Sequence, residues 1–333
     1  MRQERLIEVG RVSNGLIRTV ILLSSLVLFT WAFDVSVIQE YVPGLTRMNP
    51  TTATLFILTA CSLYLINDKS FQAKSLGKKV GLFIASIAFI RLLGINKNWD
   101  IGIDQFLFNE KLQGNRMAPD TILNFFLLGL AIYLIDKRTR KNFVLTQGIA
   151  LVAFILTLWA LIGYLYASGP LYQFPILSPM AIHTAITFLL ITIAILFSRP
   201  TTGFVSTFLN MNLGGVIFRR LLPFGIGVPV ITGLLRLQGQ RMDLFKQEFG
   251  SALAIIFIIS IFSFLMWWLA KSLNYTDQER KEAEKNLLKA TVELKKSESI
   301  YRNLIENSGV VMFTSSADGY FTFASSRALK LTG

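Results

Sequence analysis

Residues 251–269 read SALAIIFIISIFSFLMWWL, and this stretch decides the fold that the sequence predicts. It carries no charged side chain and ends in Met266-Trp267-Trp268-Leu269. An uncharged apolar run of this length is typical of a transmembrane helix, and tryptophan is enriched where such a helix meets the membrane surface. We therefore expect a membrane-spanning helix here, with the bilayer ending near Lys271.

Beyond Lys271 the same helix is predicted to leave the bilayer as a coiled coil, over residues 272–304. Apolar and small residues recur there every seven positions, which is the pattern of a coiled-coil seam. Because small and polar side chains weaken that seam, we expect a homodimer whose two helices can loosen or rotate. A solvated helix that merely separates two domains is the alternative. The predicted seam consists of Leu273, Ala283, Leu287, Ala290, Leu294, Tyr301 and Leu304.

The composition of the 333-residue chain indicates an integral membrane protein. Its hydrophobic content is 53% and its mean hydropathy is +0.53, which is too apolar for an ordinary soluble domain. The net charge of +13 comes from basic residues in short loops between apolar runs. Retention of such loops on the cytoplasmic side explains them without nucleic acid as a partner. Cys61 is the single cysteine, so we expect no intrachain disulfide and no cysteine-based metal cluster.

Seven further apolar runs have the character of membrane spans, so we expect eight spans in an all-α membrane domain, residues 15–271. Residues 1–14 are expected to form a tail, because the first run lacks a small-residue cleavage pattern. An even number of spans places both termini on one side of the inner membrane, and the excess of basic loops there predicts the cytoplasmic side. The seven runs are Gly15–Phe33, Thr51–Ile66, Val80–Ile95, Thr121–Ile135, Leu145–Ala167, Thr184–Phe197 and Leu221–Leu237.

An internal repeat links the second, fourth and sixth of these spans. Each begins with methionine, threonine and phenylalanine at a spacing of four residues. This spacing places the three side chains on one helical face, so we expect three helical hairpins that each enter their second helix through the motif. Repeats also frame the sites of transporters, but no acidic residue lies in the middle of a predicted span. The repeat residues are Met48, Thr52 and Phe56, then Met117, Thr121 and Phe125, then Met180, Thr184 and Phe188.

The seventh span differs from the others because prolines and glycines interrupt it. Pro223 and Pro229 each lack the backbone donor that an α-helix uses, which predicts a kinked or locally unwound helix. Beside the helix that leaves the membrane, these prolines mark a candidate hinge. A static kink filled by neighbouring side chains is the alternative.

The third residue after each repeat methionine is polar, and the three residues are Thr51, Asp120 and His183. If the hairpins are related by pseudosymmetry, these side chains come to one ring at the outer interface, where they would suit a small ligand or a proton. Polar helix-start residues that face water are the alternative. His183 is the single histidine, and zinc or haem sites draw on more ligands than this, so we predict no metal site.

Arg91 is the one basic residue inside an apolar run of the third span. Such a residue extends toward the membrane surface or pairs with a carboxylate, for which Asp100, Asp104 and Asp120 are candidates. With His183, Trp99 and Arg236 these residues form a hypothetical pocket for an anionic or amphiphilic ligand. The sequence contains no phosphate-binding loop, dinucleotide fingerprint or nucleophile elbow, so we assign no catalytic or cofactor-binding residue.

After the coiled coil, Tyr301-Arg302-Asn303-Leu304 leads into the apolar run Val310–Phe313, the turn Asp318-Gly319 and a second run Tyr320–Phe323. This pattern predicts a helix end, a β-hairpin and a new helix from about Ser326. It resembles the beginning of a PAS sensory domain. The resemblance implies that residues 305–333 are an incomplete PAS domain, because the whole domain is about three times as long.

The membrane part resembles the multi-span sensor region that precedes PAS domains in bacterial sensor histidine kinases and in some diguanylate cyclases. The similar features are the methionine–threonine entries, the stretch Asp100-Ile-Gly-Ile-Asp104 and the approach from Arg241 to the last span. The resemblance implies a homodimer whose output domain follows PAS, with ATP, magnesium and a response regulator bound only by that missing kinase domain. A diguanylate cyclase sensor, a transporter-like binding protein and a membrane anchor are the alternatives.

Overall fold

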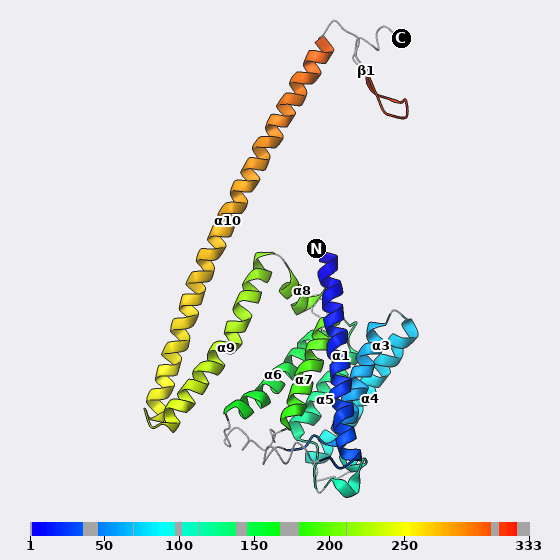
Figure 1. Ribbon diagram of the computed structural model, residues 1–333, viewed down its shortest axis with the longest axis vertical. Helices are drawn as coiled ribbons and strands as arrows, with labels where there is room; N and C mark the ends of the chain where they lie inside the picture. Colours follow the sequence, from blue (N-terminus) through cyan, green and yellow to red (C-terminus); the bar gives the residue numbers. More distant parts are fainter. Residues whose placement is uncertain are drawn as a thin grey trace. The chain divides into compact units, whose positions relative to one another are not determined.

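The structure, a computed structural model, describes residues 2–35, 46–68, 70–96, 102–112, 114–137, 145–166, 180–210, 212–307 and 313–324. It is mostly helical and divides into two compact units, Met1–Ile261 and Phe262–Gly333 (Figure 1). The first unit contains α1 (Arg2–Ala32), α3 (Pro50–Asn67), α4 (Phe71–Asn96), α5 (Pro119–Tyr133), α6 (Leu145–Tyr166), α7 (Ile182–Phe197), α8 (Gly203–Leu209), α9 (Leu213–Arg241), the beginning of α10 (Gln247–Asn307), and the 3₁₀ turns η1 (Ile103–Gln105) and η2 (Asn109–Lys111).

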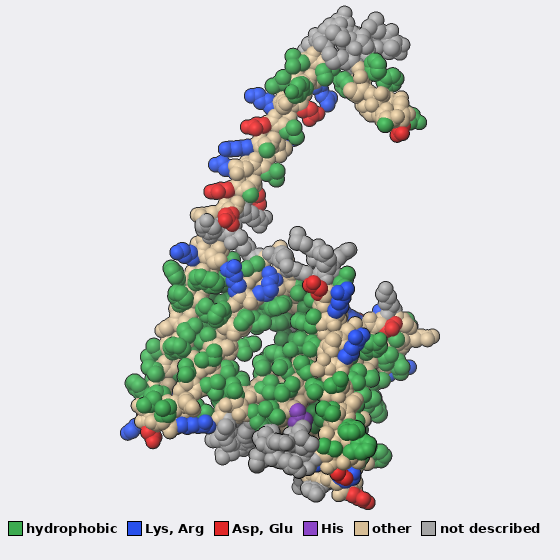
Figure 2. Space-filling view, in the orientation of Figure 1, with side chains coloured by type: hydrophobic (Ala, Val, Ile, Leu, Met, Phe, Trp, Pro, Cys, Tyr) green, Lys and Arg blue, Asp and Glu red, His purple; other side chains and the backbone are tan. Residues whose placement is uncertain are grey.

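Five of the described helices are long and apolar enough to cross a membrane. These helices are α1, α3, α6, α9 and the first part of α10, while α5 and α7 are apolar but shorter. In the first unit, hydrophobic side chains cover the middle of the helices and charged side chains lie toward their ends (Figure 2). The all-α membrane class that the sequence predicts is therefore supported, whereas the number of eight spans stays a prediction.

Six helices of the first unit form a closed ring. Each helix in the order α1, α3, α4, α5, α6, α7 packs against the next, and α7 packs against α1. Because α3, α5 and α7 also contact one another, they line the inside of the ring. The pairs α1 with α3, α4 with α5 and α6 with α7 are the three hairpins that the repeat predicts.

The inside of the ring is built from the repeat residues. The rings of Phe56, Phe125 and Phe188 contact one another pairwise, with centroids 4.8, 4.5 and 4.8 Å apart, and all three side chains are fully buried. Each of these contacts joins two different hairpins. The repeat methionines and threonines are buried as well, so the four-residue spacing does place one face of each inner helix toward the common centre. The buried repeat residues besides the phenylalanines are Met48, Thr52, Met117, Thr121, Met180 and Thr184.

Small residues allow α4 to approach both of its neighbours closely. A β-carbon built on Gly77 would lie 2.7 Å from the carbonyl oxygen of Ser62 in α3, and one on Gly81 would lie 2.6 Å from Ile132 in α5. Across that second contact, a β-carbon on Gly129 would lie 2.6 Å from the backbone nitrogen of Ala85. Backbone proximity of this kind is how membrane helices gain packing contacts where burial from water drives little association.

The helix α9 is continuous through both of its prolines. Pro223 and Pro229 leave the carbonyl groups of Arg219 and Gly225 without their usual helical donors. Of the two expected forms, kinked or locally unwound, the structure shows no unwound segment at these prolines, because the residues on both sides keep helical geometry, and a kink stays a prediction. The hinge role of these prolines stays a prediction.

The second unit consists of the remainder of α10 and a small hairpin. Strands β1 (Phe313–Ser315) and β2 (Phe321–Ala324) pair antiparallel around a turn in which Gly319 has a φ of 84°. A left-handed conformation of this kind favours glycine. The hairpin that the Asp318-Gly319 dipeptide predicts is thus present, while the helix expected from Ser326 and the residues Val310–Met312 lie outside the described residues.

Replacement of Gly129 by alanine is expected to destabilise the ring. The added methyl group meets backbone atoms of α4, which cannot rotate away, and overpacking of this kind costs about 1–3 kcal/mol. We expect Gly129→Ala to lower the Tm of the detergent-solubilised protein by several degrees. Gly225→Ala is the matched control, because no atom lies within 4 Å of a β-carbon at that helical glycine. Equal Tm values for the two variants would contradict the close packing of α4 on α5.

Candidate functional site

The candidate site is a set of hydrogen bonds at the beginning of the three inner helices. The backbone N–H of each repeat methionine donates to a side chain from elsewhere in the chain. Met48 donates to Nε2 of His183 over 2.8 Å, and Met117 donates to Oδ2 of Asp104 over 3.1 Å. The backbone of Met180 donates to the carboxylate of Asp120. Each methionine stands two residues before its helix, so its N–H has no intrahelical partner and these bonds satisfy it.

Two of these bonds connect one hairpin to another in the same rotational sense. His183 of the third hairpin accepts from the first hairpin, and Asp120 of the second hairpin accepts from the third. By the same rule, Thr51 of the first hairpin would accept a hydrogen bond from Met117 of the second. Its Oγ1 atom is instead buried without a hydrogen-bond partner among the described residues, and Asp104 takes that role. Of the three polar positions, Asp120 and His183 therefore take part in these contacts between hairpins and Thr51 does not, so the expected ring of three polar side chains stays a prediction.

The carbonyl groups of two repeat methionines are also held. Trp31 in α1 donates from Nε1 to the carbonyl oxygen of Met48 over 2.9 Å, and Tyr164 in α6 donates from its hydroxyl to that of Met180 over 2.7 Å. Sequence reasoning missed both aromatic residues. The available signal was their position, since each lies 16 or 17 residues before the methionine of its own hairpin.

A buried ion pair serves the second hairpin. Nη2 of Arg91 lies 3.1 Å from Oδ2 of Asp104, and the side chains are 8% and 0% exposed. Of the three candidate carboxylates, Asp104 is thus the partner of Arg91, whereas Asp120 is bonded to Thr121 and Met180. Asp104 follows Gly102, whose φ of 65° turns the loop back toward the bundle. The acceptor of the Met117 N–H is thus a carboxylate that is itself paired with a guanidinium.

The remaining predicted pocket residues do not join this cluster. Trp99 and Asp100 lie outside the described residues. Arg236 lies on α9, beside an apolar hollow that it shares with Thr232 and Phe245 and that does not include Arg91. Within the described part of the chain, no group of three histidine, cysteine, aspartate or glutamate residues is placed to hold a metal ion.

Burial shifts the pKa values of Asp120 and His183, the two titratable side chains among these contacts. Both residues stand just before the predicted spans. Burial lowers the pKa of His183 and raises the pKa of Asp120 to about 6, although backbone hydrogen bonds from Thr121 and Met180 oppose the second shift. Neutral His183 fits its contact, because a protonated Nε2 would carry a hydrogen and could not accept one from Met48. The ring thus contains a bond between the first and third hairpins that exists only in the neutral state of one imidazole.

The opposite end of the ring is held by a second cluster of charges. Asp136, just after α5, lies 2.6 Å from Nζ of Lys78 and 3.2 Å from Nη2 of Arg199. Burial raises the pKa of Asp136, but the hydrogen bonds and charges of its two basic partners outweigh this effect and hold the pKa below its usual value. The carboxylate therefore stays charged at neutral pH and links the ends of α4, α5 and α7.

Comparison of the chain with protein-family models, with curated proteins and with solved structures finds no match. Its function is therefore inferred from the contacts between hairpins and from α10.

Removal of Arg91 alone is expected to be more harmful than removal of the pair. Arg91→Leu leaves the buried Asp104 carboxylate without its counter-charge, and the loss of one partner of a buried pair costs about 3–5 kcal/mol. The double variant Arg91→Leu/Asp104→Asn keeps an acceptor for Met117 and removes the charge, so we expect it to recover much of the lost Tm. Arg302→Leu is the control, because its ion pair with Glu298 is exposed and should leave Tm unchanged. A double variant less stable than Arg91→Leu would contradict this account.

Acidification is expected to destabilise the wild type relative to His183→Gln. Glutamine can accept from Met48 and does not titrate. The pKa of His183 is lower in the folded state than the unfolded value of 6.5, so its stabilising contribution is complete above that pH and is lost as pH falls below it. Loss of one hydrogen bond costs about 1 kcal/mol, which corresponds to a Tm shift of about 2–4 °C.

The comparison between these two proteins isolates His183, because Asp120 titrates in both. The pKa of Asp120 is raised, so its effect on stability has the opposite pH dependence. Its stabilising contribution is lost as pH rises through about 6. We expect the Tm of wild type minus that of His183→Gln to fall between pH 8 and pH 5. A constant difference over this range would show that His183 does not act through its neutral form.

Proposed function

We propose that this chain is the membrane sensory and signal-transmitting module of a bacterial sensor histidine kinase, acting as a homodimer in the inner membrane. In this proposal eight spans perceive a membrane-borne or extracytoplasmic cue, and both termini are cytoplasmic. The helix α10 passes the resulting change to a PAS domain and onward to a kinase domain that phosphorylates a response regulator. The membrane-spanning character of the helices is the part of this proposal that rests on their length and composition.

The observation that carries the proposal is the continuity of α10. It is one helix of 61 residues, and its first part, Gln247–Asn274, is apolar enough to cross a membrane. Its later part carries charged side chains of both signs along its length (Figure 2). Because no loop interrupts α10, a rotation or shift of its membrane end would be passed along the helix and would not be absorbed by a flexible segment. A helix of this kind suits a transmitter between a membrane domain and a cytoplasmic one.

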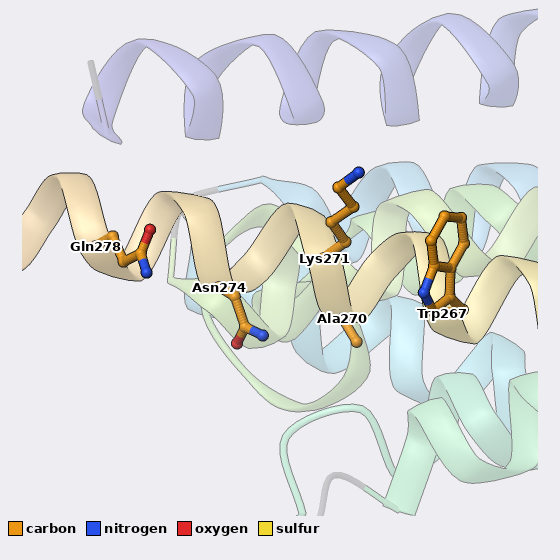
Figure 3. A pocket seen from close by; sticks show the side chains of 5 residues that line it. All are labelled: Trp267, Ala270, Lys271, Asn274 and Gln278. Carbon is orange, nitrogen blue, oxygen red and sulfur yellow. The ribbon is translucent and has the colours of Figure 1, made fainter.

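In this proposal the bilayer ends near Lys271, within the region where the apolar part of α10 gives way to its charged part. Trp267, Ala270, Lys271, Asn274 and Gln278 line a hollow on the surface of this single helix, with Lys271 and Asn274 on opposite sides (Figure 3). The Lys271 ammonium lies 5.5 Å from the centre of the Trp267 ring. An aromatic ring followed by a cation is the arrangement expected at a membrane–water interface.

The later part of α10 leaves its apolar seam exposed. Leu287 and Leu294 are both 70% exposed, and Tyr301 and Leu304 are exposed to a similar degree. A stripe of this kind with a seven-residue period is stabilised when a second helix covers it, which supports a parallel homodimer. The small residues Ala283 and Ala290 in the same stripe would leave the seam loose enough to shift between two arrangements.

The prolines of α9 supply a place for the change to begin. Each proline leaves one carbonyl without a helical donor, so bending at Pro223 or Pro229 breaks fewer hydrogen bonds than bending elsewhere. A cue can bias such a bend only by the difference of its affinity for the two states. A diguanylate cyclase sensor would use the same module, so the output reaction separates these two functions.

Tightening the seam is expected to fix the output of the full-length protein. Ala283→Leu/Ala290→Leu adds apolar contacts at the seam and should hold one arrangement. In membrane vesicles with labelled ATP, we expect formation of phosphohistidine whose rate differs severalfold from wild type and no longer responds to a cue. Lys285→Leu is the control, because this exposed residue lies on the face opposite the seam and should leave the rate unchanged.

The same vesicles test the proposal as a whole. Formation of a cyclic dinucleotide from GTP, with no phosphohistidine, would assign the module to a diguanylate cyclase. An unchanged phosphorylation rate in the double variant would contradict transmission through α10.

A further inference from the structure

The hollow between α9 and the beginning of α10 has an unusual lining. Its walls are formed by Leu235, Leu253 and Phe257, and Thr232 and Arg236 lie among them. All of these residues belong to the first compact unit. The hollow is open on one side, where Leu235 is 61% exposed and Phe257 is 46% exposed. It is thus an apolar groove along two helices into which a few polar atoms project.

The polar atoms around this groove are hydrogen-bond donors without partners. Oγ1 of Thr232, Nε of Arg236 and Nε2 of Gln240 are buried, and none has a hydrogen-bond partner among the described residues. Thr232 is only 4% exposed. Nε2 of Gln240 borders the groove, because it would lie 3.4 Å from a β-carbon at Gly250. Arg236 and Gln240 are one helical turn apart on α9, so their two unsatisfied donors are neighbours, whereas Thr232 lies a further turn along the groove. Guanidinium and amide N–H groups only donate, so this pair calls for an accepting group.

The positive charge of Arg236 also requires an anionic partner. Its side chain is half-buried, and no carboxylate pairs with it among the described residues. Arg241 lies further along α9 and does have a partner, because its Nη2 donates to the carbonyl oxygen of Tyr166 over 3.1 Å. A guanidinium between apolar helix faces is costly without a counter-charge. An anion in the groove would supply both the counter-charge and the missing acceptors.

The floor of the groove is shaped by two glycines. Phe245, in the turn between the helices, lies against Gly239 and Gly250, and a β-carbon at either glycine would come within 2.6 Å of its ring. The ring is therefore held in the angle between α9 and α10, where it closes the groove at one end. From Gly250 to Phe257 the groove follows two turns of α10, a length of roughly 10 Å.

We propose that this groove binds a fatty acid, with its carboxylate on Arg236 and Gln240 and its acyl chain along Leu253 and Phe257. A carboxylate accepts a forked pair of hydrogen bonds from a guanidinium. The volume of about 260 Å³ lies just below the range of roughly 300–1,000 Å³ for drug-sized ligands, which suits one acyl chain and not the two of a phospholipid. The groove lies between the proline-containing helix and α10, but its binding does not depend on the function proposed above.

The test uses the full chain in bilayers of phosphatidylcholine and three photoreactive probes that carry the same diazirine-labelled chain. The probes are hexadecanoic acid, hexadecanol and phosphatidylglycerol. We expect the acid to form adducts on Leu253 and Phe257, with labelling at least tenfold above that by the alcohol and above that by the two-chain lipid. Comparable labelling by the alcohol would overturn the role of the carboxylate. Stronger labelling by phosphatidylglycerol would overturn the single-chain assignment.

Two variants and a control complete the test. Arg236→Gln should reduce labelling by the acid at least tenfold without reducing labelling by the alcohol, and Ala254→Phe should reduce both because it fills the groove. Arg241→Gln is the matched control, because it removes a basic residue at the same end of α9 that does not line the groove. Equal loss in Arg236→Gln and Arg241→Gln would show a general charge effect and overturn the proposal. Because the readout is labelling, a failed kinase assay would leave this result intact.

Discussion

The contact among three phenylalanine rings is the interaction on which the rest of the first unit depends. Phe56, Phe125 and Phe188 come from three hairpins, and each ring touches both of the others. Aromatic pairs at tilted geometry and this spacing are favourable beyond their burial. Where little water is available to drive apolar surfaces together, such specific contacts and the close backbone approach at Gly81 and Gly129 decide which helices are neighbours. The ring of six helices follows from these contacts.

The hydrogen bonds at the outer end use the same pseudosymmetry but do not preserve it. At two positions a side chain of one hairpin, His183 or Asp120, accepts a hydrogen bond from the backbone N–H of the repeat methionine of another hairpin. At the third position Oγ1 of Thr51 has no hydrogen-bond partner among the described residues. The loop that carries Asp104 supplies the acceptor for Met117, and Arg91 of α4 is its counter-ion. A repeated architecture thus acquires three chemically different contacts, made by an imidazole, a carboxylate and an ion pair. Such differences give a pseudosymmetric bundle unequal responses at its three edges.

Much of this fold was predictable, and the reasons are specific. The repeat was visible because methionine, threonine and phenylalanine recur every four residues, a spacing that places side chains on one face of a helix. The Asp318-Gly319 dipeptide predicted the turn of the hairpin. The continuity of α9 was not predictable, because neighbouring helices and the missing solvent allow prolines that would break a helix in water. Trp31 and Tyr164 were missed because one is a tryptophan and the other a tyrosine, so their similar separations of 17 and 16 residues from the repeat methionine did not stand out as a repeat. The hollow at Arg236 depends on the angle between α9 and α10, which no local pattern records.

The closure of the ring also joins the first helix of the chain to one synthesised much later. Ser13 in α1 donates to the carbonyl oxygen of Ala194 in α7 over 3.0 Å, and Met48 reaches His183. Until α7 is synthesised, the hydroxyl of Ser13 in α1 and the backbone N–H of Met48 lack these partners, and folding of the first hairpin alone cannot supply them. Assembly is therefore governed by contacts of high sequence separation, which form slowly and leave exposed intermediates. Biogenesis of this bundle should depend on the insertion machinery keeping early helices together until the last one arrives.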